Sequence, residues 1–160
     1  MKKLYIILGI VIVLGAVIYF TGLYTIFVRT EIHEEVPMIL TSTTASAMPS
    51  PLVVAQGTFG EVDFIHKGSG TAKLIDVEGK QFLRLENFNV VSGPDLYVYL
   101  VKNDQPTGDI KSLGDYRNLG RLKATMGEQN YEIPGDSADH RTAVIWCQRY
   151  GVLFTFAVMK

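Results

Sequence analysis

The sequence predicts an all-β domain, an antiparallel β-sandwich of about seven to nine strands, preceded by one N-terminal transmembrane helix and a linker. Three observations lead to this prediction. The chain opens with a long uncharged stretch from Leu4 to Val28, and a segment rich in Ser, Thr, Ala and Pro follows. Beyond position 56, turn residues recur about every ten positions, and no segment shows the 3.6-residue spacing of an amphipathic helix.

The stretch from Leu4 to Val28 has the length of a membrane-spanning helix. At 1.5 Å per residue it would be roughly 37 Å long, against about 30 Å of hydrocarbon core. The alternative is a cleaved signal peptide. Its apolar region is typically about 7–15 residues and ends in a small-x-small cleavage site, which residues 30–36 lack. We therefore expect residues 1–29 to be a cytoplasmic tip and a permanent signal anchor.

The charges that flank this stretch predict its orientation. Lys2 and Lys3 precede it, whereas Arg29 follows it beside three glutamates. Cytoplasmic flanks carry an excess of Lys and Arg. We therefore expect a single-pass protein of the cell membrane, with a cytoplasmic N-terminus and an extracytoplasmic C-terminal domain.

Residues 30–56 are expected to be an extracytoplasmic linker. Their central part, TSTTASAMPSP from Thr41 to Pro51, is too polar and too poor in large side chains to bury much apolar area. The alternative is a loop that belongs to the domain.

The domain itself is expected over residues 57–160, and its strands follow from alternating apolar positions and from β-branched and aromatic composition. The expected strands are 61–66, 71–77, 81–86, 96–101, 118–123, 129–133, 143–148 and 152–159. The second and third form a hairpin around Glu78-Gly79-Lys80.

The last two strands hold the most apolar stretch of the domain. The strand 143–148 is apolar on both faces, which indicates a central place in its sheet. In the strand 152–159, four alternate residues share one face and are expected to be core. These are Val152, Phe154, Phe156 and Val158.

Composition and motifs argue against several classes of function. The formal net charge of -1 provides no basic surface for nucleic acid. A single cysteine excludes an internal disulfide and any zinc site with two or more thiolates. No catalytic triad is recognisable and no G-x-S-x-G motif is present, which argues against hydrolytic catalysis. An enzyme, with Cys147 as nucleophile and His140 as base, stays open as a third alternative. The acidic loop residues 103–109 and 136–139 lack EF-hand spacing and are interpreted as solvated carboxylates.

Several short strings stand in a fixed order along the domain. They are Gly57-Thr58-Phe59, Gly68-Ser69-Gly70-Thr71-Ala72, Leu83-Arg84-Leu85-Glu86-Asn87-Phe88, Gly93-Pro94-Asp95-Leu96-Tyr97-Val98-Tyr99-Leu100, Leu119-Gly120-Arg121-Leu122-Lys123, Gly127-Glu128-Gln129-Asn130-Tyr131-Glu132-Ile133-Pro134 and Val144-Ile145-Trp146-Cys147, then Gly151-Val152 and Phe154. In this order they resemble the electron-transfer DM-thirteen domain, over residues 57–160.

The resemblance implies a β-sandwich module of cell-surface and secreted proteins with a role in redox or electron transfer. That role depends on a family cysteine that corresponds to Cys147, either as a bare thiol or as a cofactor ligand. In animal members the domain often lies beside a haem-binding domain. This chain shows none, so a redox role implies a separate redox partner protein. Ala124 stands where the family is expected to have glycine, which puts one local turn in doubt.

From the residues alone, Cys147 has two interpretations. It is either a small core hydrophobe that does not react or a redox thiol, and a reactive thiol is expected near positive charge. Arg149 is two positions on and would share its face. A copper site is not expected, because His140 lies seven positions before Cys147 and no histidine follows.

The cofactor is not identified by the sequence. Haem remains open, since His66, His140, Cys147 and several tyrosines are potential axial ligands. The candidates for cofactor binding are Cys147, His140, Trp146 and Tyr97. The aromatic residues Tyr97, Tyr99, Tyr131 and Trp146 either line a ligand groove or belong to the core.

These observations lead to two hypotheses. The first is a membrane-anchored extracytoplasmic redox module centred on Cys147, which exchanges electrons with a partner. The second is a non-catalytic binding or structural sandwich at the cell surface, in which Cys147 is an inert core residue.

Overall fold

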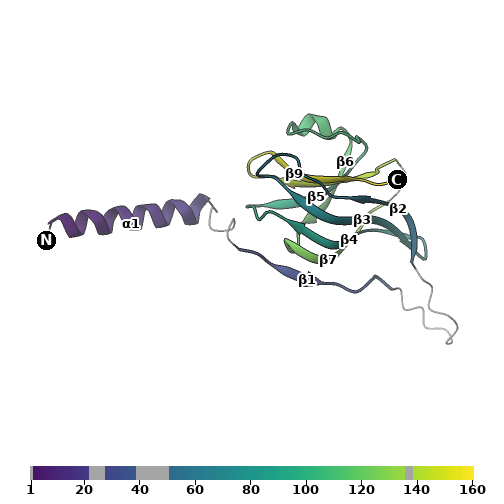
Figure 1. Cartoon of the computed structure of the whole chain (residues 1–160), viewed down its shortest axis with the longest axis horizontal. Helices are drawn as coiled ribbons and strands as arrows, with labels where there is room; N and C mark the ends of the chain where they lie inside the picture. Colours follow the sequence, from purple (N-terminus) through teal and green to yellow (C-terminus); the bar gives the residue numbers. More distant parts are fainter. Residues whose placement is uncertain (1, 22–27, 39–50, 136–138) are drawn as a thin grey trace.

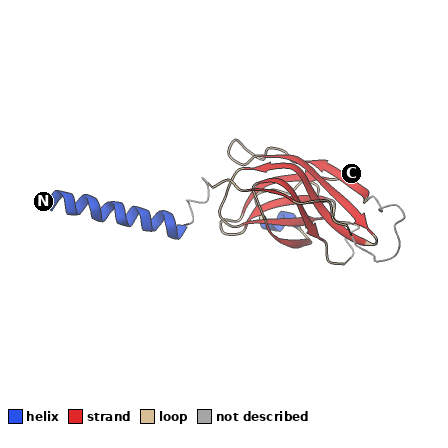
Figure 2. Cartoon of the chain, turned by 90° about the horizontal axis from the view of Figure 1, so that it is seen from below, coloured by secondary structure: helices blue, strands red, loops and turns tan. Residues whose placement is uncertain are grey.

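The computed structural model describes residues 2–21, 28–38, 51–135 and 139–160. Its elements are one α-helix, one short 3₁₀ helix and nine strands, which form two packed sheets (Figures 1 and 2). They are α1 (Lys2–Thr21), β1 (Glu31–His33), β2 (Leu52–Thr58), β3 (Gly68–Val77), β4 (Lys80–Val90), β5 (Leu96–Val101), η2 (Ile110–Leu113), β6 (Tyr116–Arg121), β7 (Met126–Glu132), β8 (Thr142–Cys147) and β9 (Val152–Val158). The predicted all-β sandwich with one N-terminal apolar helix is confirmed.

The two sheets differ in strand number and composition. One has five strands in the order β1-β7-β4-β3-β2, and the other has four in the order β6-β5-β8-β9. All described pairings are antiparallel except β1 with β7. Apolar side chains from both inner faces, among them Leu83, Leu85, Val98 and Ile145, form the core between the sheets.

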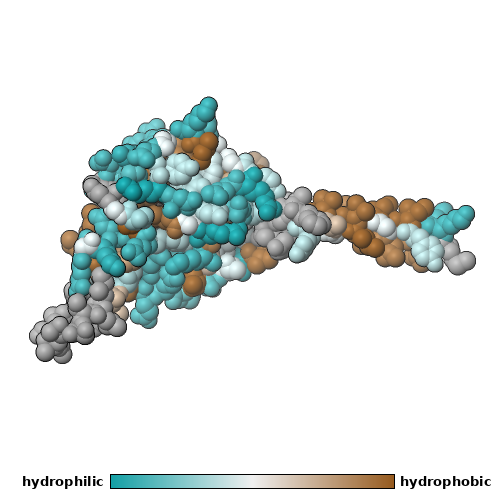
Figure 3. Space-filling model, turned by 180° about the vertical axis from the view of Figure 1, so that it is seen from behind, coloured by the Kyte–Doolittle hydropathy of each residue, from teal (hydrophilic) through white to brown (hydrophobic). Residues whose placement is uncertain are grey.

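Helix α1 stands apart from this core. Its side chains from Lys2 to Tyr19 are all exposed, and Figure 3 shows an apolar surface along much of its length. A helix of its 20 residues is about 30 Å long, which matches the hydrocarbon core. It is long and apolar enough to cross a membrane, as either an anchor or a signal sequence would be.

The segment 30–56, expected to be a linker, contributes strands at both of its ends. β1 lies at one edge of the five-stranded sheet and β2 at the other. β2 forms an antiparallel pair with β3 and so adds an edge strand to the five-stranded sheet. The pairing contains a bulge between Val53 and Ala55. Positions 39–50, which hold most of the Ser- and Thr-rich stretch, lie outside the described residues.

Two expectations for individual strands were wrong. Residues 61–66 form a turn and not a strand, because the Asp63 carboxylate accepts hydrogen bonds from the backbone amides of Ile65 and His66, each at 2.7 Å. In β9 the pairing with β8 shifts by one residue around Phe154. This bulge changes which face later residues occupy, so Phe156 packs on the outside of its sheet while Ala157 faces the core.

The other predictions for this part of the chain agree with the structure. β5 spans Leu96–Val101, and the hairpin of β3 and β4 turns at Glu78-Gly79. β8 lies between β5 and β9 with all six residues buried. Its central position explains why both of its faces are apolar.

We distinguish two ends of the sandwich. The proximal end carries residues 28–30, 59–67, 92–96 and 147–151, and it is the end nearest to α1 along the chain. Thr21 and Val28 are seven positions apart, so the distance between them is at most about 25 Å. The distal end carries the Glu78-Gly79 turn, residues 133–135 and His140. In Figure 1 the yellow-green turn that joins β8 to β9 lies at the end facing α1.

Candidate functional site

Cys147 is the last residue of β8, at the proximal end of the sandwich. It lies between Leu96 of β5 and Val152 of β9 in the four-stranded sheet. Its side chain points into the core and is 0% exposed. The strand therefore holds the only thiol of the chain at the proximal end but beneath its surface.

The polar contact described for this thiol is to a loop. The Cys147 Sγ–H donates to the carbonyl oxygen of Pro94 at 2.8 Å. Burial raises the pKa of the Cys147 thiol, and the nearby backbone amides of Tyr150 and Arg149 offset only part of this effect. The thiol is therefore protonated at neutral pH, which disfavours nucleophilic chemistry.

A surface cleft of about 400 Å³ at the proximal end, which we call the proximal cleft, is lined in part by residues of this loop. Gly93, Asp95 and Leu96, which flank Pro94, form one wall of the cleft. Thr30 and Thr125 contribute to its lining as well. Cys147 is not among the residues that line the cleft. The Pro94 loop connects the two, because its Pro94 carbonyl oxygen contacts the sulfur and its neighbouring residues line the cleft.

Two hydrogen bonds connect polar groups at the rim of the cleft. Arg121 Nη2 donates to Asp95 Oδ1 at 2.7 Å, and Ser92 Oγ donates to the Val28 carbonyl oxygen at 2.8 Å. No sequence motif predicts this cleft, because three separate segments form it. One of them, residues 28–30, belongs to the part of the chain expected to be membrane anchor and linker.

His140 lies far from Cys147. It precedes β8 at the distal end. It stands seven positions before Cys147, which at about 3.3 Å per residue amounts to roughly 23 Å. Its ring is buried, with Nε2 3.7 Å from Asp115 Oδ2. Burial and Arg117 lower the pKa of His140, so the ring is neutral at pH 7. The two residues do not form one site.

Trp146 and Tyr97 lie on the opposite face of the sheet from Cys147. They pack with Tyr99 and Leu113 beneath the segment that contains η2. The Tyr99 hydroxyl accepts a hydrogen bond from Gln148 Nε2 at 2.7 Å, and its ring stacks on Tyr116 at 4.8 Å. Tyr131, in contrast, is buried in the core from β7, so the four aromatic residues considered in the sequence do not line a common groove.

The surroundings of Cys147 do not fit a metal or haem held by its sulfur. The sulfur faces the Pro94 carbonyl and apolar side chains, not a cavity. His66 lies at the proximal end, but its Nδ1 bonds Asp63 and its ring packs edge-on against Phe154. Within the described ranges, no group of three or more His, Cys, Asp or Glu residues is arranged for a metal ion.

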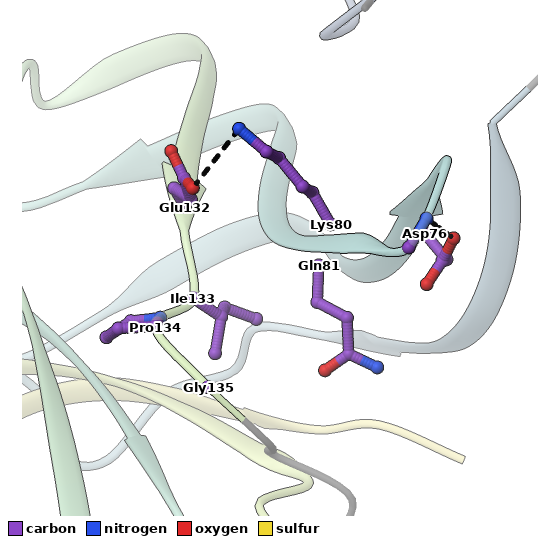
Figure 4. A pocket seen from close by; sticks show the side chains of 8 residues that line it. Asp76, Lys80, Gln81, Glu132, Ile133, Pro134 and Gly135 are labelled. Atoms are coloured by element: carbon purple, nitrogen blue, oxygen red, sulfur yellow. Dashed lines mark hydrogen bonds and ion pairs between the residues drawn. The ribbon is translucent and has the colours of Figure 1, made fainter.

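A second cleft, also of about 400 Å³, opens at the distal end beside the Glu78-Gly79 turn (Figure 4). Lys80 and Glu132 approach each other across it at 4.0 Å. Asp76 accepts a hydrogen bond from the Gly79 amide and so stabilises the turn. These two contacts join residues of the cleft to one another, and the arrangement does not indicate a particular ligand.

Comparison with known proteins gives one match. A family model described as electron transfer DM13 matches residues 58–159, a range that includes Cys147 and the Pro94 loop. No curated protein and no solved structure matches the chain.

Proposed function

The chain belongs to the electron transfer DM13 family, and on this premise we propose that it is a membrane-anchored, extracytoplasmic electron-transfer module with Cys147 as its redox residue. It exchanges electrons with a partner and does not turn over a substrate alone. Helix α1 supports the anchor by its length and exposed apolar surface. The charges at Lys2 and Lys3 support a cytoplasmic N-terminus.

One observation supports Cys147 as the exchanging group. Its thiol lies directly behind the Pro94 backbone, whose neighbours line an open cleft. Electron transfer between two groups does not require them to touch, whereas nucleophilic attack does. The buried, protonated thiol in contact with the Pro94 backbone is therefore compatible with electron exchange. The same burial disfavours thiol–disulfide exchange, which requires direct contact with another sulfur.

The proposed step involves one electron and one proton. The Cys147 thiol gives an electron to the oxidised form of a one-electron carrier on the partner, and its proton passes to water. The sulfur becomes a thiyl radical and the carrier is reduced. The reduced form of a second carrier returns the electron, and water returns the proton, which restores the thiol.

A specific observation favours a second candidate function, a surface module in which Cys147 is structural. The thiol is fully buried in the core and its pKa is raised. Buried cysteines of this kind are generally inert. In that case the domain would act through its surface, and Cys147 would matter for packing alone.

Radical detection separates the two candidates. We would oxidise the full chain in nanodiscs with a photogenerated one-electron oxidant and record electron paramagnetic resonance spectra after rapid freezing. The first candidate predicts a sulfur-centred radical that Cys147→Ala removes and that the neighbouring variant Trp146→Phe retains.

Alkylation of the same samples provides the second measurement. Both candidates predict that Cys147 reacts with a maleimide only when the domain unfolds.

Radicals confined to tyrosine or tryptophan, together with unchanged electron exchange in a folded Cys147→Ala variant, would overturn the redox role and leave the surface module.

A further inference from the structure

The loop between β2 and β3 holds large apolar side chains out in solvent. Phe64 is 85% exposed and Ile65 is 52% exposed. Val62 beside them is exposed too. Three neighbouring apolar side chains on one protruding loop are unusual on a soluble surface and indicate a contact with something apolar.

The loop is built to keep this conformation. Asp63 accepts hydrogen bonds from the Ile65 and His66 amides, and its other oxygen bonds His66 Nδ1 at 2.7 Å. The Val62 amide donates to the His66 carbonyl oxygen at 2.9 Å. The His66 ring in turn packs against Phe154. These contacts hold the base of the loop on the sandwich, while the side chain of Phe64 stays exposed to solvent.

The loop lies at the proximal end, where the chain leaves the apolar stretch. Val28 is the last residue of that stretch and Arg29 the first charged residue after it. The Val28 carbonyl accepts the hydrogen bond from Ser92, so the domain begins where the apolar stretch ends. The same end carries the turn 148–151, on which Tyr150 is also exposed.

The charges at this end largely neutralise one another. Lys67 pairs with Glu61 at 3.1 Å, and Arg121 pairs with Asp95 at 2.7 Å. Apolar contact and not attraction between opposite charges is therefore the expected driving force for any docking here. Tyr150 suits the headgroup level, because its ring is apolar and its hydroxyl is polar, whereas the apolar ring of Phe64 suits the acyl chains.

We propose that the domain docks on the membrane that holds α1, with Phe64 and Ile65 inserted into the outer leaflet and Tyr150 at the headgroup level. The inference rests on the proposed membrane anchor, because α1 keeps the proximal end beside the bilayer. Docking places the proximal cleft at the membrane surface, so a carrier that reaches it would itself be membrane-bound.

Fluorescence quenching by lipid tests this arrangement. We would reconstitute the full-length Phe64→Trp variant into vesicles of phosphatidylcholine and phosphatidylglycerol with brominated acyl chains. The native Trp146 is buried, so wild type supplies the background. We expect additional quenching for Phe64→Trp and none for Lys80→Trp at the distal end. The quenching should persist at ~1 M salt, where charge interactions are screened within about 3 Å.

A second pair of variants tests the loop itself. In Tyr150→Trp the reporter should be quenched, and adding Phe64→Ser and Ile65→Ser should abolish this quenching while the thermal unfolding midpoint stays unchanged. Chains that float with the vesicles but show no extra quenching at position 64 would overturn docking and leave the anchor intact. Chains that fail to float would overturn the anchor, and docking with it.

Discussion

Cys147 combines two properties that usually exclude each other in a redox thiol. It is the only cysteine of a chain that belongs to the electron transfer DM13 family, yet its sulfur is buried and its pKa is raised. A thiol that acts by nucleophilic attack needs exposure and a lowered pKa. If Cys147 has the proposed redox role, this environment requires that the proton stays on sulfur until an electron leaves.

The raised pKa of Cys147 predicts a loss of stability at alkaline pH. In the unfolded chain the thiol ionises near its ordinary pKa of about 8.5, whereas burial keeps it protonated in the folded domain. Its contribution is complete below the unfolded pKa and is lost as pH rises toward the folded pKa. We expect Cys147→Ala to cost about 1–2 kcal/mol of unfolding free energy at pH 7 and to weaken this pH dependence.

Urea denaturation of both proteins at several pH values between neutral and about 10 would measure the effect. Tyr99 and Tyr131 also have raised pKa values because of burial, but they are common to both proteins and cancel in the comparison. If the unfolding free energies of wild type and Cys147→Ala change equally with pH, the prediction is contradicted.

Asp63 provides a second prediction, for the loop that carries Phe64. The hydrogen bond from His66 and the backbone amides of His66 and Ile65 lower the pKa of Asp63 to about 2. The ionised Asp63 carboxylate stabilises the loop fully above its ordinary pKa of 3.8. This stabilisation is lost as the pH falls toward about 2. Carboxyl carbon NMR should show Asp63 still ionised at about pH 3, and His66→Ala should move its pKa upward. A wild-type titration at the ordinary value would show that the loop is open in solution.

At the scale of elements, β1 shows best what the sequence did not reveal. A three-residue strand rich in charge gives no strand signal, and its neighbours suggested a linker. Its pairing depends on the close approach of Gly127 in β7 to Ile32 and on the contacts of Glu34 with Lys123 and Asn130. These contacts join segments far apart in the sequence, so they can be seen only in the structure. The long strands β3, β5 and β8, in contrast, carry their own alternation or apolar composition and were predictable.

Two glycines with positive φ allow the β1 contact to be isolated. Gly127 has φ +97 and Gly120 has φ +108, so alanine is strained at either position by about 1–2 kcal/mol. At Gly127 the new Cβ would also collide with the Ile32 carbonyl oxygen, whereas at Gly120 it would meet nothing within 4 Å. We expect Gly127→Ala to be the more destabilising and to expose the Glu34 amide, which donates to the Glu128 carbonyl oxygen, to hydrogen exchange. Equal destabilisation with a protected Glu34 amide would contradict this.

Glu34 holds the segment after β1 onto the sheet. Its carboxylate accepts hydrogen bonds from Lys123 Nζ and the Asn130 amide, each at 2.7 Å, and its carbonyl accepts one from Arg84. Burial disfavours the ionised carboxylate, but Lys123 and Asn130 outweigh this effect and lower the pKa of Glu34. Glu34→Ala should therefore weaken the local structure by about 1–3 kcal/mol.

Hydrogen exchange along β7 would show this weakening as faster exchange of the Asn130 amide. Glu35→Ala is the matched control, since its side chain is exposed and the adjacent backbone is unchanged. If both variants exchange alike, the carboxylate network does not hold the segment.

At the scale of the whole molecule, the order and type of elements were predictable, but the contacts between distant segments were not. Hydrophobic length predicted α1, and alternation predicted the two sheets. The proximal cleft, the turn at Asp63 and the site of Cys147 behind Pro94 arise from contacts between segments distant in sequence. No local pattern records such contacts, so the candidate site was predictable only as a residue and not as a surface.

The orientation of the molecule gives a final prediction. Lys2 and Lys3 are the cations before the apolar stretch, and Arg29 is the first after it. We expect wild type to expose its distal end outside the cell, so that Lys80→Cys reacts with a membrane-impermeant maleimide on intact cells. Lys80 is exposed at the distal end, whereas Cys147 is buried and should stay unlabelled.

Changing both Lys2 and Lys3 to Glu leaves Arg29 as the cation nearest the apolar stretch. Because the excess of Lys and Arg selects the cytoplasmic flank, a substantial fraction of chains should then invert and lose labelling at position 80 until the cells are opened. An inverted domain would face the cytoplasm, where neither the loop that carries Phe64 nor the thiol could meet an external partner. Undiminished labelling of intact cells would show that the folded domain, and not the flanking charge, fixes the orientation.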